Sequence, residues 1–292
     1  MVNYTDIVEF TSLPYTLIKR GKVRDIYQLN EQELLIVSTD RVSAFDVILP
    51  TPIPQKGIFL NKISQFFFKL INQFLGIKNH LQTEGILIKL DDNIRQRSSI
   101  VKKAEVIKVE CIARGYLVGS LYQEYKQHCT INGVKVEKKY KFGDTLDTIL
   151  FTPTTKEETG HDRPITIDEI SRIYGEKITT HIVSKTVEIY EFCKKFLVEK
   201  GIILVDTKLE WGIVNGEIVL VDEVLTPDSS RFWLKENIDK GDVEDFYDKQ
   251  LIRNYLSKIG WDKKPPAPGL PDEIIKETAQ RYEFIYRKIV QS

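Results

Sequence analysis

The chain has 292 residues, of which 42% are hydrophobic, and its 42 lysines and arginines balance 42 aspartates and glutamates. This composition predicts a globular protein with a substantial core, and the zero formal net charge excludes a global field that would draw the chain to nucleic acid or to an anionic membrane. Three cysteines without a Cys-x-x-Cys pair argue against a disulfide framework or a cysteine zinc site and fit a reducing cytoplasm. The first ten residues lack the pattern of a signal peptide, and no apolar stretch approaches the roughly 20 residues needed to span a bilayer.

The first hundred residues are predicted to form mainly strands. An apolar run over 34–39 meets a turn at Asp40, and further strands are predicted over 86–90 and 105–111. One helix interrupts them over 60–74, where apolar residues recur at helical spacing.

The second half of the chain is predicted to be richer in helix. A long helix is expected to begin near Thr166, which forms a capping box with Glu169, and to run toward Lys200. Gly201 can adopt the left-handed conformation that ends a helix, and a buried strand over 202–205 follows.

Three further signals complete the predicted fold. Two Asn-Gly pairs, at 132–133 and 215–216, each lie between apolar residues and predict a hairpin. A proline-rich linker over 264–269 leads to a last helix over 271–290, with an apolar stripe made of Ile274, Thr278, Tyr282, Ile285 and Ile289. We therefore expect an α+β fold of two lobes, a strand-rich N-terminal lobe over 1–110 and a larger mixed lobe over 111–292.

A cationic segment surrounds Gly21. If it is a strand or hairpin, Arg20, Lys22 and Arg24 share one face, because strand side chains alternate, and Gly21 lets the backbone approach a ligand. Three cations around a glycine suit a polyphosphate. The alternative is a solvated edge strand whose charges prevent aggregation.

A second segment runs from Glu110 to Ser120. A strand is expected to end at Arg114, and Ser120 is a good N-cap for a helix that follows the intervening glycines. Helix N-termini attract phosphate, and Arg114 can add a bidentate contact to the same anion. The alternative is an ordinary capped helix.

Asp206, Lys208 and Glu210 alternate with apolar residues, so all three are predicted to project from one face of a strand. Buried charges are costly unless they are paired or bind a metal, and carboxylates beside a lysine suit Mg²⁺ and phosphate together. The alternative is a structural ion-pair cluster. A regular hairpin places Glu223 on this face, whereas a bulge at Gly212 places Asp222 there, so the residues alone leave the metal ligand open.

Two polar loops add weaker signals. The segment 225–233 follows the acidic pair, and its hydroxyl groups together with Arg231 suit an anionic sugar phosphate, although a plain turn is the alternative. The segment 151–162 is a polar loop of the kind often used for binding.

Together, in this order, these segments resemble the succinocarboxamide synthase family. The resemblance rests on the strings GKVRDIY, STDRVSAFDVILP, ECIARGYLVGS, FTPTTKEETGHD, LVDTKLEWG and LVDEVLTPDSSRFW, which extend from Gly21 to Trp233. It implies a fold related to ATP-grasp enzymes and a reaction in which ATP, L-aspartate and carboxyaminoimidazole ribonucleotide give the succinocarboxamide ribonucleotide, ADP and phosphate.

The resemblance also implies roles for individual residues. Lys22 and Arg24 would bind the ATP phosphates, and Glu110 would lie beside the adenine. Glu210 and Asp222 would hold Mg²⁺, which favours the bulge, with Glu223 as a further metal ligand. The remaining residues would bind the substrates: Arg114, Ser120, Ser230 and Arg231 the ribonucleotide phosphate, Asp206 and Lys208 the imidazole and its carboxylate, and Lys156, His161 and Asp162 the aspartate or the second substrate.

The hypothesis that fits these residues is a two-step reaction through an acyl phosphate, in a monomer or small homo-oligomer that binds only small molecules. Two other classes are weighed against it. A kinase-like phosphotransferase should show His-Arg-Asp and Asp-Phe-Gly motifs, and the sequence has neither. A non-catalytic nucleotide-binding module would not need Asp206, Lys208, Glu210 and Asp222 together.

Overall fold

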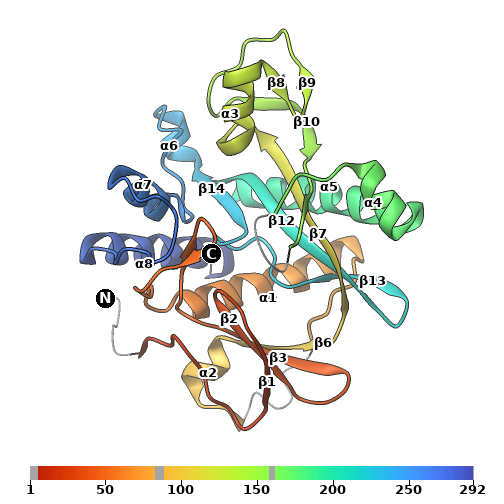
Figure 1. Cartoon of the computed structure of the whole chain (residues 1–292), viewed down its shortest axis with the longest axis vertical. Coiled ribbons are helices and arrows are strands. Elements are labelled where there is room, and N and C mark those ends of the chain that lie inside the picture. The colour runs from red at the N-terminus through yellow and green to blue at the C-terminus, as the bar shows by residue number, and fades with distance from the viewer. Residues whose placement is uncertain (1–5, 83–88, 158–161, 292) are drawn as a thin grey trace. The chain divides into compact units, whose positions relative to one another are not determined.

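A computed structural model describes residues 6–82, 89–157 and 162–291 of the chain (Figure 1). The chain divides into two compact units, the first made of Met1–Val106, Gly212–Asp228 and Tyr247–Ser292 and the second of Ile107–Trp211 and Ser229–Phe246. The chain therefore passes between the units four times, and the predicted single boundary near residue 110 lies beside the first of these crossings.

The first unit contains a four-stranded antiparallel sheet in the order β1-β2-β3-β6. Its inward side chains, among them Tyr27, Leu35 and Val37, form one apolar cluster, as the alternation of strand side chains requires. The predicted strand over 34–39 is confirmed, whereas 86–88 lie outside the described residues, and Lys89 and Leu90 belong to no strand. The strands are β1 (Thr16–Arg20), β2 (Arg24–Gln28), β3 (Glu33–Ser38) and β6 (Ser98–Lys102), with a small hairpin of β4 (Ser43–Ala44) and β5 (Val47–Ile48).

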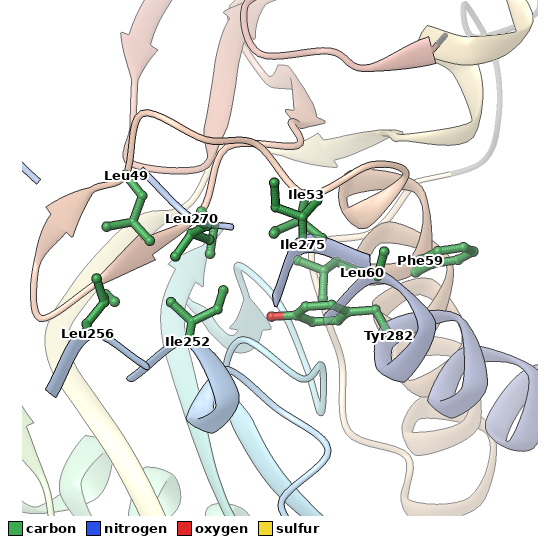
Figure 2. Packing of buried hydrophobic residues seen from close by; sticks show 12 residues of the cluster. Leu49, Ile53, Phe59, Leu60, Ile252, Leu256, Leu270, Ile275 and Tyr282 are labelled. Atoms are coloured by element: carbon green, nitrogen blue, oxygen red, sulfur yellow. The ribbon is translucent and has the colours of Figure 1, made fainter. Parts of the chain in front are cut away.

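Helices from both ends of the chain build the second core of the first unit. Both predicted helices are confirmed, and side chains from α1, α7 and α8 join Leu49, Ile53 and Leu270 in one buried apolar cluster (Figure 2). These helices are α1 (Lys56–Leu75), α2 (Asp92–Gln96), α7 (Gln250–Lys258) and α8 (Asp272–Tyr286), which continues as a π-helical turn over Arg287–Gln291.

The second unit is built on a sheet in which β7 and β12 are the central strands. β10 pairs with β7 on one side, β11 pairs with another part of β7, and β14 pairs with β12. β7 ends two residues beyond the predicted end at Arg114, and β12 joins the predicted strand over 202–205 to the alternating residues Asp206, Lys208 and Glu210 in one continuous strand. The strands are β7 (Glu105–Tyr116), β10 (Thr145–Phe151), β11 (Thr154–Thr155), β12 (Ile202–Val214) and β14 (Ser230–Leu234).

Short elements connect these strands. Both predicted Asn-Gly hairpins are confirmed, and Asn132, Gly133, Asn215 and Gly216 all have the positive φ that a type I′ turn requires. The last residues of β12, Gly212–Val214, belong to the first unit, where the second hairpin lies. The elements are α3 (Gly119–His128), β8 (Thr130–Ile131), β9 (Val134–Lys135), β13 (Glu217–Val221) and α6 (Lys235–Asp239).

The predicted long helix is two helices, α4 (Ile167–Tyr174) and α5 (Glu176–Glu199). The capping box at its start is confirmed, since the Glu169 amide donates to Thr166 Oγ1 at 3.2 Å and the Thr166 amide donates to Glu169 Oε2 at 2.8 Å. The prediction of one continuous helix is wrong because Gly175, at φ 83° and ψ 156°, leaves the helical conformation. Throughout the described part of the chain, no helix has both the length and the apolar character to cross a membrane.

Candidate functional site

Two arginines converge on Asp206 in the second unit. Arg231 lies opposite Asp206 in the pairing of β14 with β12, and its Nε donates to Asp206 Oδ1 at 2.9 Å. Arg114, from β7, donates through Nη1 to Asp206 Oδ2 at 3.0 Å and through Nε to Thr152 Oγ1 at 2.9 Å. Burial lowers the pKa of Arg114, and the charge of Asp206 opposes that shift. The carboxylate thus fixes the directions of both guanidinium groups.

Gly115 and Gly119, which follow Arg114, allow other side chains to lie close to the backbone. Gly119 has φ 58°, and a Cβ atom there would lie 2.4 Å from Arg231 Nη1. A Cβ at Gly115 would lie 2.2 Å from the Tyr190 hydroxyl. The prediction that Ser120 is the N-cap is wrong: α3 begins at Gly119, because Val118 has the extended conformation of the cap position, so Ser120 lies in the first helical turn.

A cleft of about 540 Å³ lies in the second unit, and Arg114 and Ser120 are both in its wall. That volume falls within the range of small-molecule sites. The rest of the wall includes Thr152 and Thr154 from the polar segment 151–162, for which sequence analysis predicts a part in binding. Sequence analysis did not assign three polar residues of the wall to a site: Asn132, which it placed only in a hairpin turn, and Glu124 and Asp168, which belong to none of its motifs.

Two ion pairs lie beside the arginine cluster in the same unit. Lys208 pairs with Glu110 of β7, and Lys156, directly after β11, pairs with Glu210. Thr154 also donates to Glu110 Oε2 at 3.1 Å. The carboxylate side chains are 7% and 11% exposed, whereas the two lysines are 35% and 36% exposed, so the cations remain accessible to a ligand.

In the first unit Arg24 holds the acidic pair that follows β13. Its guanidinium group lies 2.7 Å from Asp222 Oδ1 and 2.8 Å from Asp222 Oδ2, and 3.4 Å from Glu223 Oε1. β13 ends at Val221, and Asp222 has φ 67°, so the alternation of strand side chains does not extend to the pair. Strand alternation therefore cannot decide which of Asp222 and Glu223 is the predicted metal ligand. Both carboxylates contact the same arginine, Arg24.

The three cations near Gly21 do not share one face, so that prediction is wrong. Gly21 and Lys22 lie in the turn between β1 and β2, where the Gly21 amide donates to the Arg24 carbonyl at 2.7 Å. Arg20 pairs with Asp25 at 3.4 Å, and Lys22 pairs with an exposed carboxylate, that of Asp46, at 2.6 Å. Strand alternation cannot be applied across a turn, which is why the three point to different partners.

His80 is a residue of this region that sequence analysis missed. It is 4% exposed, its ring hydrogen-bonds the backbone of Asp222, and burial lowers its pKa to about 4. The backbone of Leu220 accepts the His80 amide at 3.1 Å. No motif spacing selects a buried histidine whose contacts are to backbone groups that come together only in the fold.

The other predicted residues are placed as follows. Ser230 is buried, and its hydroxyl lies 2.8 Å from the Thr207 hydroxyl. Asp162 accepts the Glu157 amide at 2.8 Å, and His161 lies outside the described residues. The predicted metal ligands are divided, Glu210 belonging to the second unit and Asp222 and Glu223 to the first. Over 6–82, 89–157 and 162–291 no group of three or more His, Cys, Asp or Glu side chains is arranged to hold a metal ion.

Comparisons with known proteins agree on one family. The family model described as SAICAR synthetase matches residues 17–268. The phosphoribosylaminoimidazole-succinocarboxamide synthase of Thermodesulfovibrio yellowstonii is 46% identical over 277 residues, which cover 93% of this chain and 94% of that protein. The protein of the same name from Maridesulfovibrio salexigens is 40% identical, covering 98% and 97%. A solved structure of SAICAR synthase from Saccharomyces cerevisiae, complexed with SAICAR, matches with a TM-score of 0.84 and 36% identity over 98% of each chain.

Proposed function

Since the chain belongs to the SAICAR synthetase family, we propose how its side chains serve the reaction of that family. The protein is an ATP-dependent carbon–nitrogen ligase of purine biosynthesis, which joins L-aspartate to carboxyaminoimidazole ribonucleotide and releases the succinocarboxamide ribonucleotide, ADP and phosphate. The observation that carries this conclusion is the family match, which extends over nearly the whole chain. None of the matches named above favours a kinase-like phosphotransferase or a non-catalytic module.

We assign the ribonucleotide phosphate to Arg114, Ser120, Ser230 and Arg231. Two guanidinium groups whose directions are fixed by one carboxylate suit the planar, multidentate recognition of a phosphate. Arg114 and Ser120 also line the cleft, whose volume suits a ligand of nucleotide size. Ser230, with its hydroxyl against Thr207, would contribute mainly through its backbone.

We assign the imidazole carboxylate to Lys208, with Asp206 orienting the neighbouring arginines. A carboxylate is a poor acylating agent, because its oxygen is a bad leaving group. Transfer of the γ-phosphoryl group from ATP to a carboxylate oxygen would form an acyl phosphate, and the aspartate amine would then attack the acyl carbon and expel phosphate. Lys208 and Lys22 would neutralise the charge that develops on the transferred group.

Glu110 and Lys208 touch each other, and we assign Glu110 to the adenine nucleotide together with Lys22 and Arg24. A contact between a nucleotide residue and a substrate residue suits a reaction in which a phosphoryl group moves from one ligand to the other. We assign Lys156, His161 and Asp162 to aspartate.

We propose that Glu210, Asp222 and Glu223 supply oxygen ligands for Mg²⁺. Carboxylate oxygens suit this ion, which prefers one or two carboxylates and substrate phosphates over a cage built of protein ligands alone, so Glu210 of the second unit or the Asp222–Glu223 pair of the first would each be enough. Arg24 contacts both oxygens of Asp222, and a carboxylate with about four lone-pair sites retains acceptor capacity beside such a bidentate pair. Bound Mg²⁺ supplies charge neutralisation on the phosphate oxygens. We place the enzyme in the cytoplasm as a monomer or small homo-oligomer acting on small molecules.

The test is ADP release from the purified protein with ATP, Mg²⁺, the carboxylated imidazole ribonucleotide and L-aspartate, with each component omitted in turn. The proposal requires release that depends on all four and a succinocarboxamide product. Full release without aspartate would instead indicate a phosphotransferase, and bound ATP without release would indicate a binding module.

A further inference from the structure

The loop between β13 and β14 leads into the proposed phosphate residues. Thr226 Oγ1 donates to Glu223 Oε2 at 2.8 Å and accepts the Asp228 amide at 3.2 Å, so the loop is closed by its own side chains. Asp228 is the last residue of the first unit before the chain enters the second, and Ser230 and Arg231 follow it after one residue, Ser229. Asp228 is thus the last side chain of the loop to be held within the first unit, and β14, with Ser230 and Arg231, begins two residues later.

The carboxylate of Asp228 is buried and is held by three side chains. Lys56 Nζ lies 2.8 Å from Oδ2 in an ion pair, with side-chain exposures of 0% and 3%. Lys249 Nζ lies 3.4 Å from the same oxygen, and the Tyr282 hydroxyl lies 2.7 Å from Oδ1. Burial opposes ionisation of Asp228, but Lys249 and Lys56 hold its pKa below the usual value. Burial and the charge of Asp228 raise the pKa of Tyr282 well above its usual value, so the phenol stays protonated and donates.

The three partners come from helices at both ends of the chain. Lys56 is the first residue of α1, Lys249 directly precedes α7, and Tyr282 lies in the middle of α8. Figure 2 shows the Tyr282 ring packed among the apolar side chains near Leu60 and Ile275. A ring with 1% exposure in a close-packed cluster can direct its hydroxyl group only toward one place.

We propose that Tyr282 is a positioning residue of the ligase, which with Lys56 anchors Asp228 and thereby sets the loop that presents Ser230 and Arg231 to the ribonucleotide phosphate. The inference rests on the proposed function of Arg231. The proposal gives α8 a part in substrate binding through the Tyr282 hydroxyl. Tyr282 lies outside all the sequence strings that carry the family resemblance. A phenylalanine at this position would fill the same space and lose only the hydrogen bond to the anchor.

The test compares Tyr282→Phe with Tyr286→Phe, a matched change one turn further along α8. Tyr286 stacks on Phe59 at 5.4 Å between ring centroids, and its hydroxyl accepts from Gln291 Nε2 at 3.4 Å, away from Asp228. Loss of a hydrogen bond to a charged group predicts a KM for the ribonucleotide raised about 10-fold in Tyr282→Phe, with the KM for ATP changed less than about twofold. Hydrogen–deuterium exchange should rise in peptides covering 224–232 and stay unchanged in α1 and β7. Tyr286→Phe should match the parent protein in every readout.

Two results would overturn the inference. One is an unchanged ribonucleotide KM in folded Tyr282→Phe. The other is faster exchange throughout the first unit with both KM values changed in parallel, which would make the residue merely structural. Arg231→Ala, assayed beside them, separates this failure from that of the proposed function: if Arg231→Ala leaves the ribonucleotide KM unchanged, the assignment of the phosphate itself is wrong.

Discussion

Two carboxylate–arginine clusters, one in each unit, differ in what surrounds them. In the first unit Asp40 and Arg97 form a pair 2.9 Å long in which both side chains are 0% exposed. Asp40 also accepts the Val8 and Gly57 amides, and Arg97 also donates to Asn93 Oδ1 at 2.8 Å. The pair is thus buried among protein donors and acceptors.

In the second unit Asp206 and its two arginines lie beside a cleft. The side chains of Arg114 and Arg231 are 13% and 14% exposed, and the nearby Lys156 and Lys208 are about a third exposed. Loss of one partner from a fully enclosed pair leaves an uncompensated buried charge, whereas a cluster that binds a ligand must keep cations accessible. The comparison predicts that substitutions in the enclosed pair change stability and that substitutions beside the cleft change catalysis.

The largest expected effect is on the enclosed pair. Arg97→Ala leaves the buried Asp40 carboxylate without its cation and should lower the free energy of unfolding by about 3–5 kcal/mol. Urea denaturation followed by circular dichroism measures this change. The control is Arg95→Ala, in which the lost partner, Asp92, is 78% exposed, and little change is expected. A loss below about 1 kcal/mol for Arg97→Ala would break the distinction between the two clusters.

The next effect is on turnover. Lys208→Ala removes an accessible cation from the proposed phosphoryl-transfer site and should lower kcat by about 10²–10³-fold with the fold intact. Steady-state ADP release and the circular dichroism spectrum measure both parts. Lys185→Ala is the control, because Lys185 is also paired and 34% exposed, on α5, but has no proposed role. Near-normal turnover of Lys208→Ala would remove Lys208 from the mechanism.

Local patterns predicted most of the architecture because they depend on neighbours in the chain. The capping box at Thr166, both Asn-Gly turns and the strand alternation from Asp206 to Glu210 are signals of this kind. The break at Gly175 escaped the same reasoning, since a glycine is tolerated within many helices and the apolar pattern continues beyond it.

Contacts between distant segments could not be predicted in this way. Arg24 and Asp222 are 198 residues apart, and no periodicity links the first residue of β2 to the residue that follows β13. Arg231 reaches Asp206 past Gly119, a helix start that the sequence placed one residue later. Such pairs depend on how the sheets are ordered, which the resemblance to a family could imply but the residues alone could not.

The smallest expected effect tests whether lining the cleft is enough to make a residue functional. Thr166 is in the wall of the cleft, but its side chain accepts the Glu169 amide as a helix cap. Thr166→Ala should lower the free energy of unfolding by about 1 kcal/mol, while Thr166→Ser, which keeps the cap, should cost less. Because the hydroxyl is already engaged by α4, the KM values and kcat should stay within about twofold of the parent protein in both variants. Thermal unfolding and the ADP release assay measure the two effects separately. A large rise in the ribonucleotide KM for Thr166→Ala alone would extend the functional surface from the arginine cluster to the first turn of α4.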